Sequence, residues 1–192
     1  LSTPHLASTN ALNSLMFTFE GISAHAAGSP ESGRSALDAV ELLNTGVEYM
    51  REHLSDDARI HYSITDGGQA PNVVPAEATV WYFVRAPTRE EVEQHTAWLR
   101  DIAEAAAKMT QTSVSERFLT GCYDYRANET ISNVLWDNMQ EVGPIDYDEN
   151  DYAFAKKLQS TFSSDHVQKA LSDLPDDRLK SIQEKALNPE PV

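Results

Sequence analysis

The sequence is poor in basic residues, has a single cysteine and contains no long apolar run. Among its 192 residues, 15 Lys and Arg stand against 30 Asp and Glu, a net charge of −15 at pH 7. Because nucleic-acid binding depends on Lys and Arg that neutralise phosphates, we expect no nucleic-acid partner. The single cysteine, Cys122, excludes an internal disulfide and any zinc site built from cysteines. No apolar run approaches the roughly 20 residues of a membrane span, so we expect no membrane partner.

The first residues also lack the basic and then apolar pattern of a secretion leader, and we expect a cytoplasmic protein. The chain begins with Leu1 rather than Met, which predicts a piece of something longer. Its length allows one domain or one and a half. Hydrophobic residues make up 41% of the sequence, an ordinary share for a folded domain.

Residues 14–120 carry a regular succession of apolar patterns. Alternation of apolar and polar residues predicts four strands, at 15–23, 58–65, 77–85 and 111–119. Apolar residues three and four positions apart predict two helices, at 35–54 and 88–109. The order strand, helix, strand, strand, helix, strand predicts an α+β, ferredoxin-like βαββαβ fold. Its four-stranded antiparallel sheet should carry both helices on one face.

The flanking segments have a different character. Residues 1–13 are predicted to be an irregular lead-in. After Gly121, the sequence predicts a short helix capped by Asn128 and ended by Gly143-Pro144, then an acidic turn at 146–151. Two further helices are predicted, at 151–163 and 175–187. The helices of 121–192 have too little apolar surface for a core of their own. We therefore expect them to pack on the first domain, on a partner chain or on a domain outside this sequence.

His25 is the leading candidate for chemistry. It lies among very small residues, in the run GISAHAAGSP at 21–30, between a predicted strand and a predicted helix. Ala, Gly and Ser leave room beside the imidazole, and histidine can donate, accept or ligate near neutral pH. The structural interpretation is a surface loop histidine with no ligand, and the sequence leaves both interpretations open.

Two further residues are candidates for binding. Asn72 follows a glycine-rich loop, so it is either a turn asparagine or an amide that contacts a substrate. Arg85 ends an apolar and aromatic strand, where alternation places it on the same face as Trp81 and Phe83. Its guanidinium can pair with a protein carboxylate, or it can hold a substrate carboxylate with two parallel hydrogen bonds.

Other polar residues show no catalytic or metal-binding pattern. Glu90-Glu91 suits the first turn of a helix, where acidic side chains favourably meet the helix dipole. The remaining candidates have no ligand spacing or activating neighbour; they are His53, His61, His95, Asp165-His166 and Cys122. The residues therefore supply no activated nucleophile, metal site or acid–base pair within this chain.

Four segments in this order resemble one enzyme family. They are FEGISAHAA at 19–27, GRSALDAV at 33–40, PNVVP at 71–75 and VRAP at 84–87. They resemble the lid, or dimerisation, domain of the di-zinc aminoacylase/carboxypeptidase metallopeptidases. Within it they are most similar to the members that cleave aryl-acyl amino-acid amides such as p-aminobenzoyl-glutamate. Ala86-Pro87 and the tail segment 153–156 (AFAK) support that subgroup.

The resemblance implies that this chain works together with other segments of a longer protein. In the family the lid interrupts a catalytic domain, lids of two subunits pair, and a lid histidine stabilises the oxyanion in the partner's site. That histidine corresponds to His25, and the asparagine and arginine that hold the substrate's carboxylate correspond to Asn72 and Arg85. The zinc ligands and general-base glutamate lie before and after this segment. Zinc is thus expected in the full-length enzyme, not in this chain, and the fragment alone should be inactive.

The expected protein is therefore a homodimeric zinc amidohydrolase, in which 14–120 form the lid and 121–192 return to the catalytic domain. A second hydrolase subunit is a further partner that the resemblance allows. The alternative function is a non-catalytic dimerisation module, or a regulatory module that binds an amino acid, because such domains share this topology. A third interpretation is a pure scaffold in which His25 faces no ligand.

Overall fold

The computed structural model describes residues 9–143 and 145–162, which divide near residue 134 into two compact units. The first unit holds the elements of the predicted fold, together with a 3-10 turn at Pro30–Ser32. In chain order they are β1 (Ala11–Glu20), α1 (Ala36–Arg51), β2 (Arg59–Asp66), β3 (Glu77–Ala86), α2 (Arg89–Thr110) and β4 (Ser113–Cys122).

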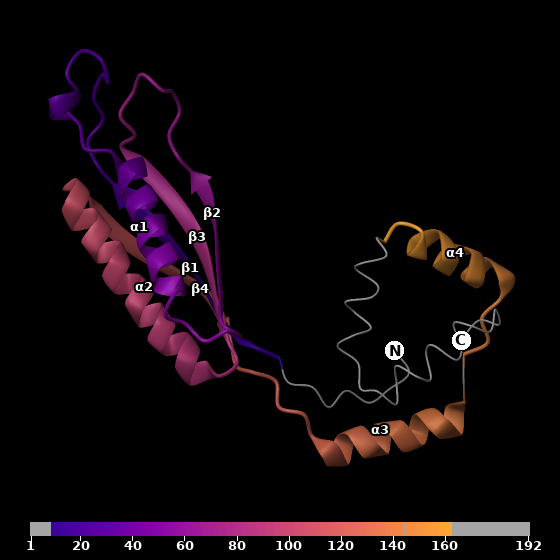
Figure 1. The fold of residues 1–192 in the computed structure, drawn as a ribbon. Coiled ribbons are helices and arrows are strands. Elements are labelled where there is room, and N and C mark those ends of the chain that lie inside the picture. Colours follow the sequence, from indigo (N-terminus) through magenta and orange to yellow (C-terminus); the bar gives the residue numbers. More distant parts are fainter. Residues whose placement is uncertain (1–8, 144, 163–192) are drawn as a thin grey trace. The chain divides into compact units, whose positions relative to one another are not determined.

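The four strands form one antiparallel sheet in the order β2-β3-β1-β4. Helices α1 and α2 pack side by side on one face of this sheet (Figure 1). This arrangement confirms the predicted ferredoxin-like fold. It leaves β2 and β4 as the two edge strands.

The hydrophobic core lies between the helices and the sheet. Leu15, Phe17 and Phe19 of β1 alternate toward the helices, and all three are buried. On the neighbouring strand, Tyr82 is fully buried and its hydroxyl hydrogen-bonds Asn44 of α1. The apolar stripe of α1 and the small alanines of α2 fill the other side of the core. The alternation in β1 and the apolar stripe of α1 thus point to residues that the structure buries.

The opposite side of the sheet, the open face, carries the alternate residues of each strand. The pairing register arranges them in rows that run across the strands. One row holds Arg59, Arg85, Leu12 and Cys122, and the next holds His61, Phe83, Ser14 and Thr120.

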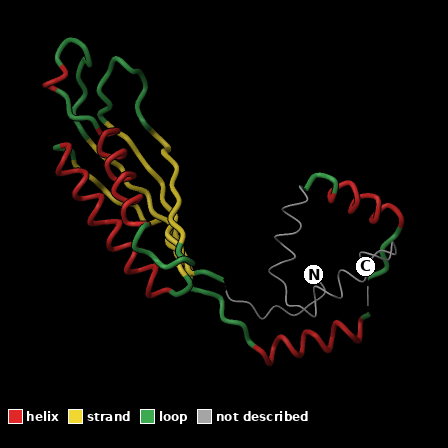
Figure 2. The backbone as a smooth tube through the Cα atoms, viewed as in Figure 1, coloured by secondary structure: helices red, strands yellow, loops and turns green. Residues whose placement is uncertain are grey.

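The two ends of the sheet differ. At the base, β1 begins and β4 ends. Arg89 Nη1 joins these strands by donating to Leu12 O at 3.1 Å and Asn13 Oδ1 at 2.7 Å in β1, and to Cys122 O at 3.5 Å in β4. At the tip, two long loops project past the strands (Figure 2). The histidine loop is 21–35 and the asparagine loop is 67–76. The base is therefore where the chain enters and leaves the unit.

The boundaries of the unit differ from those predicted. Strand β1 begins at Ala11, inside the predicted lead-in 1–13, and β4 runs to Cys122, beyond residue 120. The alternation is hard to detect because Asn13, a polar residue, faces the core. Its amide donates to Thr96 Oγ1 at 3.0 Å in a buried contact. A polar residue can face the core of a sheet when it has a hydrogen-bond partner. Its polarity then interrupts the apolar alternation by which a strand is detected in the sequence.

Two helices follow the sheet. Helix α3 (Glu129–Val142) begins at the predicted cap, where Asn128 Oδ1 accepts from Ile131 N at 3.0 Å. Helix α4 (Glu149–Gln159) begins inside the predicted acidic turn because Asp148 caps it. Main-chain N–H groups of Asp151 and Asn150 donate to Asp148 and lower the pKa of that carboxyl. The predicted helix at 175–187 lies outside the described residues.

Candidate functional site

The histidine loop is closed at its neck by close backbone contacts. Ile22 and Arg34 exchange two main-chain hydrogen bonds of 2.8 Å. Just before them, a Cβ atom on Gly21 would lie 2.0 Å from Arg34 O, so only glycine fits. The Arg34 guanidinium then donates from Nε to Gln111 Oε1 at 2.7 Å, just after α2. These contacts fasten the loop to the body of the unit.

The histidine loop and the asparagine loop hydrogen-bond to each other around His25 and Asn72. Ala26 N donates to Asn72 O at 3.0 Å, and Val74 N donates to Ala24 O at 2.9 Å. His25 and Val73 are therefore partners in an antiparallel bridge. The structure thus brings two sequence-predicted site residues, His25 and Asn72, together at the tip.

The imidazole of His25 is held by its own loop. Its Nδ1 atom accepts from Gly28 N at 3.0 Å and from Ala27 N at 3.2 Å. An imidazole nitrogen that accepts is unprotonated, so the neutral ring carries its proton on Nε2. The side chain is exposed. The loop therefore presents an oriented N–H donor to solvent.

The small residues around His25 have a defined part in this geometry. A Cβ atom on Gly28 would lie 3.3 Å from His25 Nδ1, tighter than most real Cβ contacts. Glycine lets the main-chain N–H approach the ring closely. The run of small residues at 21–30 thus lets main-chain N–H groups reach the imidazole of His25.

Asn72 is exposed, and it contributes to the fold through hydrogen bonds of its main chain. Its carbonyl accepts from Ala26, and the turn that holds it is closed by Val73 N donating to Ala70 O at 3.1 Å. Among the described residues, the side-chain amide of Asn72 has no hydrogen-bond partner. Its donor and acceptor atoms are thus available to a ligand.

Arg85 lies at the other end of the sheet. It is exposed on the open face, near the base, with its guanidinium carbon 5.4 Å from the centre of the Phe83 ring. This confirms that Arg85 and Phe83 share a face. Along β3, Arg85 is about 27 Å from Glu77 at the tip, at about 3.4 Å per residue. Within one chain, therefore, Arg85 does not meet His25 and Asn72.

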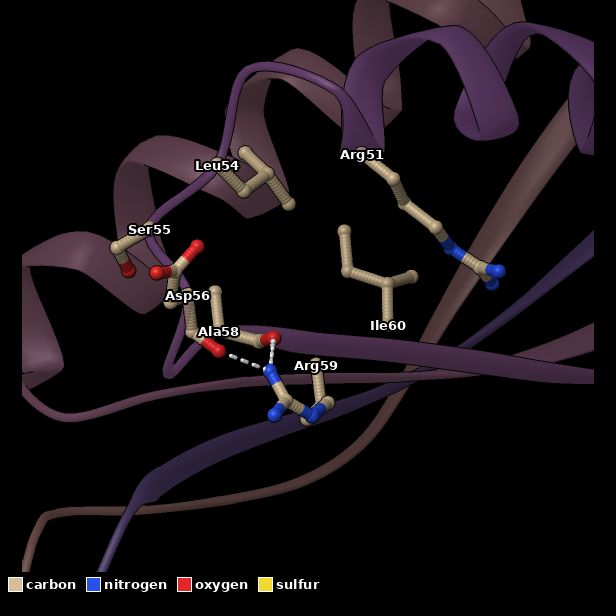
Figure 3. Close-up of a pocket in the computed structure, with 7 residues that line it drawn as sticks. All are labelled: Arg51, Leu54, Ser55, Asp56, Ala58, Arg59 and Ile60. Carbon is tan, nitrogen blue, oxygen red and sulfur yellow. Dashed lines mark hydrogen bonds between the residues drawn. The ribbon is translucent and has the colours of Figure 1, made fainter.

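Three shallow pockets in the described surface have linings that include none of His25, Asn72 and Arg85. One of about 300 Å³ lies at the base, between the end of α1 and the start of β2 (Figure 3). Its lining includes two arginines, Arg51 and Arg59. A second, of about 360 Å³, adjoins the asparagine loop and is lined by Leu37 together with loop residues. The candidate site is thus a pair of exposed surfaces rather than an enclosed cavity.

The other histidines that the structure describes do not form a metal-binding group with His25. Within 9–143 and 145–162, no group of three His, Cys, Asp or Glu side chains is placed to hold a metal ion. His53 stacks on Trp98, with ring centres 6.4 Å apart. His95 has its pKa lowered by burial. Glu90 and Glu91 occupy the first turn of α2, as predicted, and Thr88 Oγ1 accepts from Glu91 N.

The sequence of this domain matches a known family. The model of the peptidase dimerisation domain matches residues 9–110, more than half of the chain. The chain belongs to the peptidase dimerisation domain family. The match begins two residues before β1, in agreement with the observed start of the sheet.

Relatives of this peptidase dimerisation domain are named as hydrolases. One is a subunit of the p-aminobenzoyl-glutamate hydrolase of Escherichia coli (strain K12). It is 43% identical over 157 residues, which are 81% of this chain and 33% of that protein. The Xaa-Arg dipeptidase of Mus musculus is 31% identical over 65% of this chain and 29% of its own length. The chain thus spans about a third of the length of these relatives, and the predicted resemblance is confirmed.

A solved structure shows the same fold. The aminobenzoyl-glutamate utilization protein from Klebsiella pneumoniae superimposes with a TM-score of 0.58 at 22% identity. The superposition covers 66% of this chain and 32% of that one.

Within the residues that the structure describes, none of the helices of this dimerisation domain has the length and apolar character needed to cross a membrane.

Proposed function

We propose that this chain is the lid and dimerisation segment of a homodimeric amidohydrolase whose substrates are aryl-acyl amino-acid amides such as p-aminobenzoyl-glutamate. The observation that carries the proposal is the separation of the candidate residues. His25 and Asn72 lie together at the tip, and Arg85 lies near the base of the same sheet. One amino-acid amide cannot bridge that distance. A site that uses all three residues must therefore combine the tip of one protomer with the base of its partner.

The edge strand β2 offers a surface through which two protomers can pair. Edge strands that are not protected tend to pair with another chain. Strand β2 has no charged residue from Ile60 to Thr65, and its Tyr62 and Ile64 side chains are 40% and 42% exposed. The other edge, β4, is protected by charge and by an irregularity. Glu116 is bound to Arg100 at 2.6 and 2.8 Å, and the β1–β4 register shifts beside Leu15.

Pairing through β2 brings the two halves of the site to the same end. In a two-fold dimer with antiparallel β2 strands, the two sheets point in opposite directions. The tip of each protomer then lies at the base end of its partner. The His25 and Asn72 side chains of one protomer would thus share an end of the combined sheet with the partner's Arg85.

The chemistry of each residue suits one part of an amide substrate. The Nε2–H of His25 is an oriented donor, and a donor placed where negative charge develops on the scissile carbonyl lowers the barrier to hydrolysis. Asn72 can donate its amide to the same substrate from the neighbouring loop. Arg85, with a planar guanidinium on an exposed strand end, suits the carboxylate of the amino acid.

Zinc, which the resemblance implies, would supply the activated water of the full-length enzyme. The described residues do not form a site for it, since no three potential ligands converge. We therefore assign the metal to segments other than the described residues. The residues of this chain orient the substrate and stabilise charge. The relatives' names, all of hydrolases, favour this function over a regulatory module.

Subunit mixing tests the composite site. Full-length His25→Ala and Arg85→Ala enzymes should each be nearly inactive on p-aminobenzoyl-glutamate. Unfolding and refolding them together should restore about a quarter of wild-type activity, because half of the dimers are mixed and each holds one intact site of two. A chain that uses its own three residues would show no recovery.

The matched control mixes His25→Ala with Asn72→Ala. Both residues lie on the same tip, so in the mixed dimer each site keeps one defect. No activity should return. Recovery in this pair as well would contradict the assignment of both residues to one protomer. Full activity of the single variants would instead favour a scaffold in which His25 faces no ligand.

A further inference from the structure

Arg59 is the direct neighbour of Arg85 on the open face. The pairing of β2 with β3 places Arg59 opposite Arg85, and directly opposite residues of an antiparallel pair point to the same side. Their Cβ atoms are then about 5 Å apart. Two arginine side chains thus leave the open face from neighbouring positions at the base of the sheet.

Like charges in directly opposite positions destabilise a sheet unless an anion lies between or beside them. In the part of the chain that the structure describes, no carboxylate lies within 4.0 Å of either guanidinium. This is unexpected in a chain with 30 acidic and 15 basic residues, where a carboxylate is easily supplied. The pair is positively charged and open to a ligand.

Both side chains are held in place by neutral contacts. The Nη1 atom of Arg59 donates to Asp56 O and, at 2.6 Å, to Ala58 O, as Figure 3 shows. Its Nε and Nη2 atoms have no partner among the described residues. Arg85 rests against the Phe83 ring. Contacts of this kind orient the two cations without neutralising them.

We propose that Arg59 and Arg85 together bind a substrate with two carboxylates, an acyl derivative of an acidic amino acid. Arg85 binds the main-chain carboxylate, and Arg59 binds the carboxylate of the acidic side chain. This inference rests on the proposed function for Arg85 and adds a residue that determines specificity. An enzyme built in this way prefers acyl-glutamate over the corresponding acyl-glutamine, which has the same shape and lacks the second charge.

The experiment compares p-aminobenzoyl-glutamate with p-aminobenzoyl-glutamine on the full-length enzyme. Arg59→Gln should lower kcat/KM for the glutamate substrate about 10- to 100-fold, since a hydrogen bond to a charged group is lost. Its kcat/KM for the glutamine substrate should stay unchanged. Arg59→Lys, which keeps the charge, should keep most of the preference. Arg85→Gln should impair both substrates.

The control is Arg117→Gln, an exposed arginine of the open face whose guanidinium contacts Met16 Sδ at 3.1 Å. It should leave both substrates unaffected. If Arg59→Gln lowers activity on both substrates equally, Arg59 pairs with another part of the enzyme, and the inference is wrong while the proposed function stands. If the wild-type enzyme cleaves neither substrate, the proposed function fails and the inference with it.

Discussion

The Nδ1 atom of His25 accepts a hydrogen bond from the main-chain N–H of Gly28 at 3.0 Å. A second N–H, from Ala27, reaches the same atom at 3.2 Å. The loop therefore selects the tautomer as well as the direction of the ring. This relationship connects the small residues of the sequence to a chemical property of the histidine. A pre-oriented donor loses little entropy when charge develops on a substrate.

His25→Ala tests this donor directly in the full-length enzyme. We expect kcat to fall about 100-fold or more with KM nearly unchanged, because an oxyanion donor acts mainly in the transition state. Steady-state kinetics on p-aminobenzoyl-glutamate measure both constants. His53→Ala, which removes an exposed histidine stacked on Trp98, is the matched control and should leave kcat unchanged. A large rise in KM at constant kcat would assign His25 to ground-state binding instead.

The strands and helices of the first unit could be predicted from sequence because their periodicity reflects burial on one side. Leu15, Phe17 and Phe19 alternate, and the structure buries all three. The start of β1 could not be found in this way, since Asn13 is polar and yet faces the core through its bond to Thr96.

The candidate site is harder to assemble from sequence. The loop between β2 and β3 is long, so no tight turn sets their register, and the pairing of Arg59 with Arg85 has no signal in the sequence. The contact between His25 and Asn72 likewise depends on two loops that bridge at the tip. Residue types point to candidate positions, but only the fold shows that Arg85 lies at the far end.

Gly21→Ala should destabilise the domain. The new methyl group would lie 2.0 Å from Arg34 O, a main-chain atom held in the neck of the histidine loop. We expect the free energy of unfolding in urea to fall by about 1–3 kcal/mol, as for other overpacked sites. Gly67→Ala is the control, because its added methyl would make only ordinary contacts, at 3.5 Å and beyond. Equal stability of the two variants would show that the neck can open without cost.

Ile64→Lys should separate the dimer of the full-length enzyme. The substitution places a charge on the unprotected edge strand β2, where a partner strand would have to bury it. Sedimentation velocity should show a monomer, and activity should fall because each site needs both protomers. Phe118→Lys on the opposite edge, where the side chain is also exposed, should leave the dimer intact. A dimer that survives Ile64→Lys and dissociates with Phe118→Lys would move the interface to β4.

Tyr82 should make the stability of the domain sensitive to alkaline pH. Burial raises the pKa of the Tyr82 hydroxyl, and in the unfolded chain that pKa is about 10. The folded state therefore holds its proton where the unfolded state releases it. Stability from this group is fully present below about pH 10 and is lost as the pH rises further. Urea unfolding of the 192-residue chain at several pH values, followed by tryptophan fluorescence, measures the slope.

Tyr82→Phe separates this contribution from other groups that titrate in the same range. Near neutral pH the variant should be less stable by about 1–3 kcal/mol, because Asn44 Oδ1 loses its partner in the core. Above about pH 10 the difference between the two proteins should shrink, since only the wild type loses stability by ionising this group. A constant difference from neutral pH to about pH 11 would mean that the Tyr82 hydroxyl ionises as readily in the folded domain as in the unfolded chain.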